Sequence, residues 1–341
     1  MRPNITIKDI AQKLNVSVST VSRALRDTSD INAETKQKVL DLAKSLDYQP
    51  NQVALSLVKS STKTLGVVVP NIGYSFFASV LQGIDKEASK EGYSLLLCQS
   101  NEQLEKEKSN IQNLLRSQVE GFIISLTDNR VEEEHIQKLV KKRIPLVVFD
   151  RYSNLVDCSK VIIDNKEASK TAVMHLIQQG SKRVAMLAGP AHLHISHRRI
   201  EGYKEALRDA KLPFDPSLIL HCDFSLQNVS ENIQAFWTNQ AIKPDGIFAS
   251  SDRIAISAIH TLKKLQVKVP EEVSVIGFND DPMGAMFTPS LSTVAQPSFE
   301  IGQEVVKLLL EQIRQPDYQA SEHKTIVLPT KLNIRESSVK K

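Results

Sequence analysis

The sequence has no long run of apolar residues. Its longest apolar stretches, such as residues 66–69 and 95–97, are far too short to cross a bilayer. Residues 1–5 also lack the apolar segment that a secretory signal requires. These absences predict a soluble protein that is neither inserted in a membrane nor exported, and we expect it in the cytoplasm.

Cysteine is scarce, and glycine lacks the spacings that mark nucleotide sites. The three cysteines, Cys98, Cys158 and Cys222, lie 60 and 64 positions apart, which fits neither a disulfide framework nor a zinc site. The 12 glycines never form Gly-x-Gly, and no Gly-x-Ser-x-Gly segment occurs. We therefore expect a reduced compartment, no cofactor or metal, and no enzymatic activity.

The composition is that of a globular protein, with 41% apolar and 24% charged residues. A length of 341 residues suggests two or three domains. Of the net charge of +4, residues 1–60 carry +3, from nine Lys or Arg and six Asp or Glu. A basic end suits a nucleic-acid partner, although an ordinary solvated surface produces such a bias as well.

The pattern of apolar residues changes near residue 60. Before it, helical spacing predicts three short helices, with Thr6, Ser17 and Asn32 as their N-caps. After residue 64, strand-like runs alternate with amphipathic helices, which is typical of βαβ units and parallel sheets. The sequence thus predicts an all-α headpiece followed by an α/β core of two doubly wound lobes. The strands are expected at 65–69, 93–98, 120–125, 146–150, 183–188, 246–249 and 273–277, and the helices at 76–91, 103–117, 131–142, 165–179, 197–210, 225–239 and 252–265.

Residues 6–25 have the layout of a helix-turn-helix, with a tight turn at residues 14–16. In that motif the second helix lies in the major groove of DNA. Ser19, Ser22 and Arg23 are expected to project outward, where hydroxyls suit phosphate oxygens and arginine can pair with guanine. Spacing alone leaves open a small helical bundle with a serine-rich surface.

Segments in both parts of the chain are similar to one known family. They are residues 16–25, 39–57, 65–70, 121–124, 147–150, 199–203, 250–252 and 275–280. These segments resemble the lactose-repressor (LacI/GalR) family. The resemblance implies a homodimeric transcriptional repressor or activator that binds double-stranded operator DNA, with a core like that of periplasmic binding proteins. It also implies a small effector, a sugar or sugar derivative, that changes operator affinity.

The resemblance assigns roles in DNA binding. It implies that Val18, Ser19 and Arg23 read bases, and that Thr20 and Ser22 face phosphates. Residues 51–58 match the hinge helix of the family, in which Leu57 is a wedge that enters the minor groove. The alternative is a linker whose apolar side chains pack on the core. The expected DNA-binding residues are Thr6, Ser17, Val18, Ser19, Thr20, Ser22, Arg23, Asn51, Val53, Ala54 and Leu57.

A ligand of a two-lobed α/β protein binds at the carboxyl ends of the strands, between the lobes. Arg199, Asn279 and Asp150 match positions at which members of the family bind polar groups of the effector. Any of them is alternatively a helix cap or a salt bridge between the lobes, and Asp252 is expected to be a cap. The expected effector-binding residues are Tyr74, Phe76, Phe77, Asp150, Arg199, Ser251 and Asn279.

Three histidines occur within six residues, at His192, His194 and His197. No acidic or cysteine ligand accompanies them nearby, so a metal site is disfavoured. We expect them in a loop that enters the cleft, where they either contact the effector or are solvated.

The expected domains are a headpiece (1–48), a hinge and linker (49–63) and a core (64–341). Lobe 1 is expected at about 64–163 and 293–323, and lobe 2 at about 164–291 and 324–336. No apolar heptad follows Leu332, so we expect a dimer that does not form a tetramer. The alternatives are a solute-binding protein of the periplasmic type and a regulator controlled by a protein partner.

Overall fold

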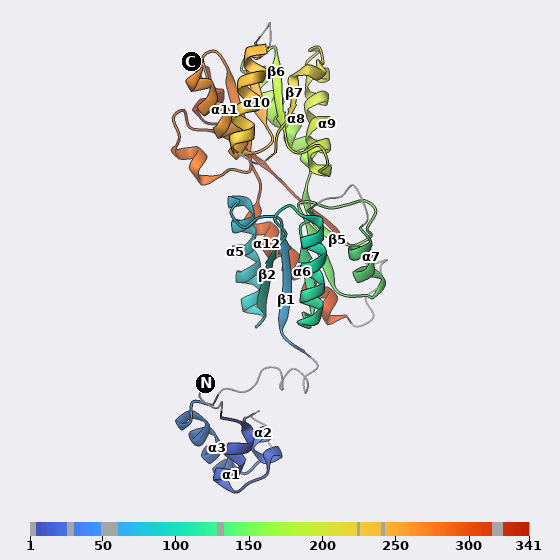
Figure 1. Cartoon of the computed structure of the whole chain (residues 1–341), viewed down its shortest axis with the longest axis vertical. Coiled ribbons are helices and arrows are strands. Elements are labelled where there is room, and N and C mark those ends of the chain that lie inside the picture. The colour runs from blue at the N-terminus through green and yellow to red at the C-terminus, as the bar shows by residue number, and fades with distance from the viewer. Residues whose placement is uncertain are drawn as a thin grey trace. The chain divides into compact units, whose positions relative to one another are not determined.

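The computed structural model describes residues 5–25, 31–48, 61–127, 133–223, 226–239, 243–315 and 323–340 (Figure 1). The contacts within the chain divide it into two compact units, Met1–Thr62 and Lys63–Lys341. No helix in the described ranges is both long and apolar enough to span a bilayer.

The first unit contains the three predicted helices, α1 (Ile7–Leu14), α2 (Val18–Leu25) and α3 (Ala33–Ser45). Each contributes two residues to a small buried core, because helical spacing gathers them on one face. The core residues are Ile10, Ala11, Val21, Ala24, Val39 and Ala43.

The predicted caps of these helices are confirmed. The Asp9 carboxylate accepts hydrogen bonds from both the backbone N–H and the hydroxyl of Thr6, each at 2.7 Å. The Ser17 hydroxyl accepts from the backbone N–H of Thr20 at 3.1 Å, and Asn32 accepts from the N–H of Glu34 at 2.8 Å. These bonds satisfy N–H groups that a helix start leaves unpaired. They fix where each of the three helices begins.

The second unit holds the seven predicted helices and the seven predicted strands, together with elements that the sequence did not reveal. The helices are α5 (Ser75–Lys90), α6 (Leu104–Arg116), α7 (Glu134–Lys141), α8 (Asn165–Gln178), α9 (His194–Asp209), α10 (Leu226–Asn239), α11 (Asp252–Lys264) and α12 (Ser298–Arg314). The strands are β1 (Thr64–Val69), β2 (Ser94–Gln99), β3 (Gly121–Ile124), β4 (Leu146–Phe149), β5 (Ser159–Ile163), β6 (Val184–Ala188), β7 (Ile219–His221), β8 (Gly246–Ala249), β9 (Ser274–Phe278), β10 (Ser292–Ala295), β11 (Thr325–Leu328) and β12 (Lys331–Asn333).

The strands form two sheets, one in each lobe. The strand order is β11-β5-β4-β3-β1-β2 in the first sheet and β12-β10-β9-β8-β6-β7 in the second. All pairings are parallel except that of β10 with β12. The inner strands β1, β3, β4, β6, β8 and β9 are almost wholly buried, because helices cover both faces of a parallel sheet.

The chain passes between the lobes three times, after β5, after β10 and after β11, and Figure 1 lets the reader follow these segments. The expected lobe boundaries are wrong at two strands. β10 belongs to lobe 2, because it pairs with β9, and β11 belongs to lobe 1, because it pairs with β5. Both strands have only four residues, too few for their periodicity to reveal which sheet they join.

Glycines let the helices that flank the cleft pack closely. A Cβ on Gly302 of α12 would lie 2.1 Å from the carbonyl oxygen of Val80 on α5. A Cβ on Gly202 of α9 would lie 2.1 Å from the carbonyl oxygen of Lys166 on α8. The start of α5 and the first turns of α9 are thereby held in place, and both carry residues of the site.

Candidate functional site

The outer face of α2 is polar, and most of the residues that were expected to bind DNA lie on it. Val18 is 42% exposed, and Ser17, Ser19 and Arg23 are exposed as well. Thr20 and Ser22 are half-buried. The Ser17 hydroxyl lies 2.7 Å from the hydroxyls of both Ser19 and Thr20, so three hydroxyls gather at the N-terminus of this helix.

Two groups of expected DNA-binding residues differ from this face. Thr6 is exposed but engaged in capping α1 through Asp9. The hinge residues Asn51, Val53, Ala54 and Leu57 lie outside the described residues.

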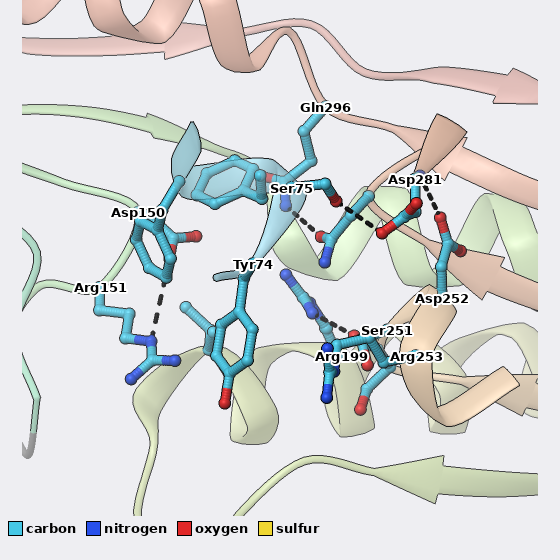
Figure 2. Close-up of a pocket in the computed structure, with 15 residues that line it drawn as sticks. Tyr74, Ser75, Asp150, Arg151, Arg199, Ser251, Asp252, Arg253, Asp281 and Gln296 are labelled. Atoms are coloured by element: carbon cyan, nitrogen blue, oxygen red, sulfur yellow. Dashed lines mark hydrogen bonds and ion pairs between the residues drawn. The ribbon is translucent and has the colours of Figure 1, made fainter. Parts of the chain in front are cut away.

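A cavity lies between the two lobes, and every residue that was expected to contact an effector lines it (Figure 2). Its walls come from the ends of strands and the starts of helices in both lobes, as the rule for α/β proteins predicts. The lining residues are Tyr74, Ser75, Phe76, Phe77, Asp150, Arg151, Ile195, Arg199, Ser250, Ser251, Asp252, Arg253, Asn279, Asp281 and Gln296.

Arg199, in α9, is held rigidly at this cavity. Its Nε donates to Asn165 Oδ1 at 2.8 Å, and one terminal nitrogen donates to the Ser250 carbonyl oxygen at 2.6 Å. The guanidinium stacks on Phe278, 3.7 Å from the ring centroid. The side chain is buried, and burial lowers its pKa to about 10, so it stays charged at pH 7. Its remaining N–H groups are available to a ligand.

Asp150 follows β4 with a left-handed backbone (φ 56°), which turns its side chain into the cavity. Burial raises its pKa above the ordinary value, and the charges of Arg151 and Arg199 oppose that rise. Arg151 itself forms a two-pronged pair with Glu102, at 2.6 and 3.1 Å. Asp150 is therefore the carboxylate that offers acceptor oxygens on this side.

The other expected polar residues come from lobe 2. Asn279 follows β9, and its Oδ1 accepts from Gln296 Nε2 at 2.7 Å, which leaves its own amide N–H groups for a ligand. Ser251 caps α11, because its hydroxyl accepts from the N–H of Ile254 at 3.3 Å. Ser251, and not Asp252, is thus the cap of this helix.

The aromatic residues differ in how far they reach the cavity. Phe76 and Phe77 are buried, and the Phe77 ring packs edge-on against Phe149 in the core of lobe 1. Tyr74 is half-buried, and Arg253 of lobe 2 lies 5.2 Å from its ring centroid. Figure 2 shows Arg151 on one side of Tyr74, and Arg199 and Arg253 on the other side. Tyr74 is the best placed of the three to face a ligand.

Comparison with known proteins identifies the family. Residues 6–51 match the model of the bacterial regulatory proteins of the lacI family, and residues 173–338 match a periplasmic binding protein-like domain. The chain is 32% identical over 336 residues to catabolite control protein A of Priestia megaterium, covering 98% of this chain and 99% of that protein. The chain belongs to the LacI family. It is a transcriptional regulator with a DNA-binding helix-turn-helix.

Another curated LacI-family relative is the ribose operon repressor of Halalkalibacterium halodurans, which is 33% identical and covers 98% of this chain and 97% of the repressor. Among solved structures, the lac repressor dimer bound to operator and an anti-inducer has a TM-score of 0.87 at 23% identity, covering 98% and 99% of the two chains. A LacI-family regulator of Enterococcus faecium with bound ribose has a TM-score of 0.71 at 29% identity, covering 81% and 98%.

Several residues of this LacI-family cavity escaped the sequence analysis. Arg253 directly follows Asp252 at the start of a predicted helix. The sequence therefore offered a signal for it, because that helix begins just after the carboxyl end of a predicted strand. Gln296 follows β10, a strand that was not predicted, so no signal marked it. Ser75 and Asp281 are joined across the cleft by a 2.7 Å hydrogen bond from the Ser75 hydroxyl, a contact that no local pattern reveals.

Asp252 has a structural role in this site. Its carboxylate accepts from the Thr293 hydroxyl at 2.7 Å and from the Asp281 backbone N–H at 2.6 Å. Burial raises the pKa of Asp252 to about 6 despite these bonds. The side chain therefore holds the loop after β9 against α11 and titrates near neutral pH.

Replacing Asp252 by asparagine tests this titration. The folded protein keeps the proton up to about pH 6, whereas the unfolded chain loses it near 3.8, so the folded state binds more protons between these values. The stability of the wild type relative to the variant should therefore fall by about 2 kcal/mol from pH 4 to 7. Urea unfolding of both proteins at several pH values measures this difference, and parallel curves would contradict the assignment.

The three histidines were expected to lie together in a loop, and this prediction is wrong. His194 and His197 lie in the first turn of α9, and His192 precedes the helix. His194 packs against Tyr152 of lobe 1 with ring centroids 4.9 Å apart, His197 is exposed, and His192 lines a neighbouring cavity. Within the described ranges, no cluster of three His, Cys, Asp or Glu side chains is suited to hold a metal.

Proposed function

We propose that this LacI-family regulator is a homodimer that binds a pseudo-palindromic operator, and that a sugar or sugar derivative in the cavity between the lobes sets its operator affinity. The observation that carries this proposal is the convergence of Arg199, Asp150 and Asn279 on one cavity whose walls belong to both lobes. The bound ribose of the Enterococcus faecium structure and the name of the ribose operon repressor support a sugar-like effector.

The chemistry of the three polar side chains suits a hydroxylated ligand. The guanidinium of Arg199 offers fixed donors, the carboxylate of Asp150 accepts from hydroxyl groups, and the amide of Asn279 donates from its free N–H groups. Tyr74 offers a ring face to the apolar side of a sugar. Hydroxyls distributed around a ring can satisfy donors and acceptors on both lobes at once.

A ligand between the lobes can control DNA binding because it joins two bodies linked by three segments of chain. The lobes already touch across the cleft, through Ser75 with Asp281 and through Tyr152 with His194. A ligand that binds one lobe angle more tightly than another shifts the population toward that angle. Operator DNA must then change effector affinity by the same factor.

The test is a titration of the selected operator with candidate metabolites. Operator duplexes are first selected from random DNA, and fluorescence anisotropy then measures affinity with and without each sugar. We expect at least one sugar-like compound to change operator affinity by about 5–150-fold, the usual range of allosteric coupling. If operator affinity is the same with every compound that calorimetry finds to bind, the cavity does not control DNA binding.

The exposed face of α2 is the proposed DNA-reading surface. A side chain such as Val18 can contact a thymine methyl, and Arg23 can pair with the two acceptors of guanine. The hydroxyls of Ser17, Ser19 and Thr20 suit phosphate oxygens near the helix N-terminus.

Replacing Arg23 by alanine should weaken operator binding by about 1–3 kcal/mol and relax the base preference at one position of each half-site. The reason is that Arg23 pairs with guanine only in the specific complex, so the substitution removes an interaction from that complex alone. Binding of operator and random duplexes at matched salt measures the effect, with Lys38→Ala on the exposed side of α3 as a control. An equal loss on both duplexes would make Arg23 a phosphate contact only.

A second copy of the chain is the proposed occupant of an apolar face on the core. β2 is the edge strand of the first sheet, and its Leu96 and Leu97 are 39% and 46% exposed. Ile72, 48% exposed, lies beside this strand, because its N–H donates to Gln99 at 3.0 Å. Monomeric proteins rarely leave an apolar edge strand uncovered. The lac repressor dimer supports a partner copy as its cover.

A further inference from the structure

The cavity between the lobes contains three arginines, and they differ in how their charges are balanced. Arg151 is neutralised by Glu102, through two hydrogen bonds of 2.6 and 3.1 Å. Glu102 faces a neighbouring cavity, so this pair forms a wall of the site. The charge of Arg151 is accordingly met by the protein itself.

Arg199 and Arg253 are different. Within the residues that the structure describes, neither has a carboxylate within 4.0 Å of its guanidinium. Arg199 is only 5% exposed, and its hydrogen bonds go to neutral acceptors on Asn165 and Ser250. Arg253 lies over the Tyr74 ring, and its Nε is buried with no hydrogen-bond acceptor. Asp150 is the carboxylate whose charge reaches Arg199, but it lies beyond ion-pair distance and leaves the hydrogen bonds of Arg199 to neutral groups. A buried guanidinium balanced in this way is costly, and a bound anion offsets that cost.

The carboxylates on the same side of the cavity are already occupied by other donors. Asp252 accepts from Thr293 and from the N–H of Asp281. Asp281 accepts from the hydroxyl of Ser75 and from the N–H of Met283, at 2.7 and 2.9 Å. These bonds direct the Asp252 carboxylate, at the start of α11, and the Asp281 carboxylate, in the loop after β9, to donors other than Arg199 and Arg253. Asp150, on the lobe 1 side, lies at the other end of the cavity, as Figure 2 shows.

The start of α11 adds to the positive character of this end. A helix N-terminus carries a partial positive charge and favours anions. Independently of the helix, the Ser250 side chain lines the cavity next to this terminus, is 2% exposed, and its Oγ has no hydrogen-bond partner. Gln296 is 7% exposed, and its Oε1 is unpartnered as well. The site therefore keeps buried polar atoms that a ligand can engage.

We propose that the effector carries an anionic group, a phosphate or a carboxylate, and that this group binds between Arg199 and Arg253 at the N-terminus of α11. The hydroxylated remainder of the effector then lies toward Asp150, which accepts from hydroxyls. The effector is accordingly a sugar phosphate or a sugar acid rather than a neutral sugar. This inference rests on the proposed function, since it specifies the ligand of the same cavity.

Inorganic phosphate and acetate test the anion site directly on the full-length protein. Each is titrated against ionic-strength-matched chloride, and the shift in melting temperature gives an apparent Kd. We expect a saturable shift with one of the two ions, and a Kd about tenfold weaker or more in Arg253→Gln, because a charge-assisted contact is lost. The matched control is Arg208→Gln, an exposed arginine of α9 that does not line the cavity and should leave the Kd unchanged.

The ion that binds identifies the group: phosphate points to a sugar phosphate and acetate to a sugar acid. A shift that saturates equally in the wild type and in Arg253→Gln, or no shift beyond that of chloride with either ion, overturns the proposal. Binding at the DNA-reading face of α2 gives the first of these results, because it does not depend on Arg253.

Failure of this inference is distinguishable from failure of the proposed function. A neutral sugar that changes operator affinity in the wild type and in Arg253→Gln alike leaves the proposed function intact and overturns the anion site. An anion effect that depends on Arg253, together with operator affinity that no sugar phosphate or sugar acid changes, supports the anion site and overturns the effector role of the cavity.

Discussion

Replacing Arg199 by alanine is expected to abolish the response of operator binding to the effector. Arg199 enters the cavity with its guanidinium fixed by Asn165, Ser250 and the Phe278 ring, so its free N–H groups are already oriented for a ligand. Losing hydrogen bonds from a charged donor costs about 1.5–3 kcal/mol each. Effector affinity should fall by about 100-fold or more. Calorimetry measures that affinity, and anisotropy measures the operator response.

Operator binding without effector is the internal control for Arg199→Ala. It should stay within about threefold of the wild type, because Arg199 belongs to the core unit and the DNA-reading residues of α2 belong to the other unit. Loss of the Asn165 and Ser250 bonds will lower stability, so circular dichroism must first establish that the variant is folded at the assay temperature. Full effector affinity in a folded variant would make Arg199 a structural residue and move the ligand site elsewhere.

The elements that could be predicted from the sequence are those with long, regular patterns. α1 and α2 carry capping residues and apolar spacing that act over a few positions, so their ends were predicted correctly at Thr6 and Ser17. The inner strands of both sheets are continuous apolar runs, which a sheet buried on two faces requires. Such signals depend on residues that are only a few positions apart, so a single sequence is enough to detect them.

Short strands and contacts between distant segments left no such signal. β10, β11 and β12 have three or four residues, and which sheet each joins depends on the path of the chain between the lobes. For the same reason Gln296 was missed although it bonds to Asn279, which was predicted. Val18 was assigned to the DNA face through the family resemblance, and its 42% exposure is compatible with that assignment. Strand ends located the cavity, while only the fold revealed its charge distribution.

Replacing Leu97 by glutamate is expected to break the proposed dimer and, with it, most of the affinity for the operator. Leu97 is 46% exposed on β2, the edge strand of the first sheet. A carboxylate buried against a second copy would be left without a partner, and its desolvation cost would oppose association. Sedimentation should report a monomer at concentrations at which the wild type is a dimer.

The effect on DNA follows from linking two headpieces. A dimer binds its second half-site with an effective concentration set by the first, which raises affinity by about 10²–10⁴-fold. Leu97→Glu should lose about that factor on a full operator and nothing on a single half-site, because α2 belongs to the other unit of the chain. Gln112→Glu, at an exposed position on α6, introduces the same acid as a control. A variant that stays dimeric and keeps its operator affinity would move the dimer interface to another face of the core. The next residues to substitute would then be Phe287 and Met286 of lobe 2, which are 38% and 78% exposed.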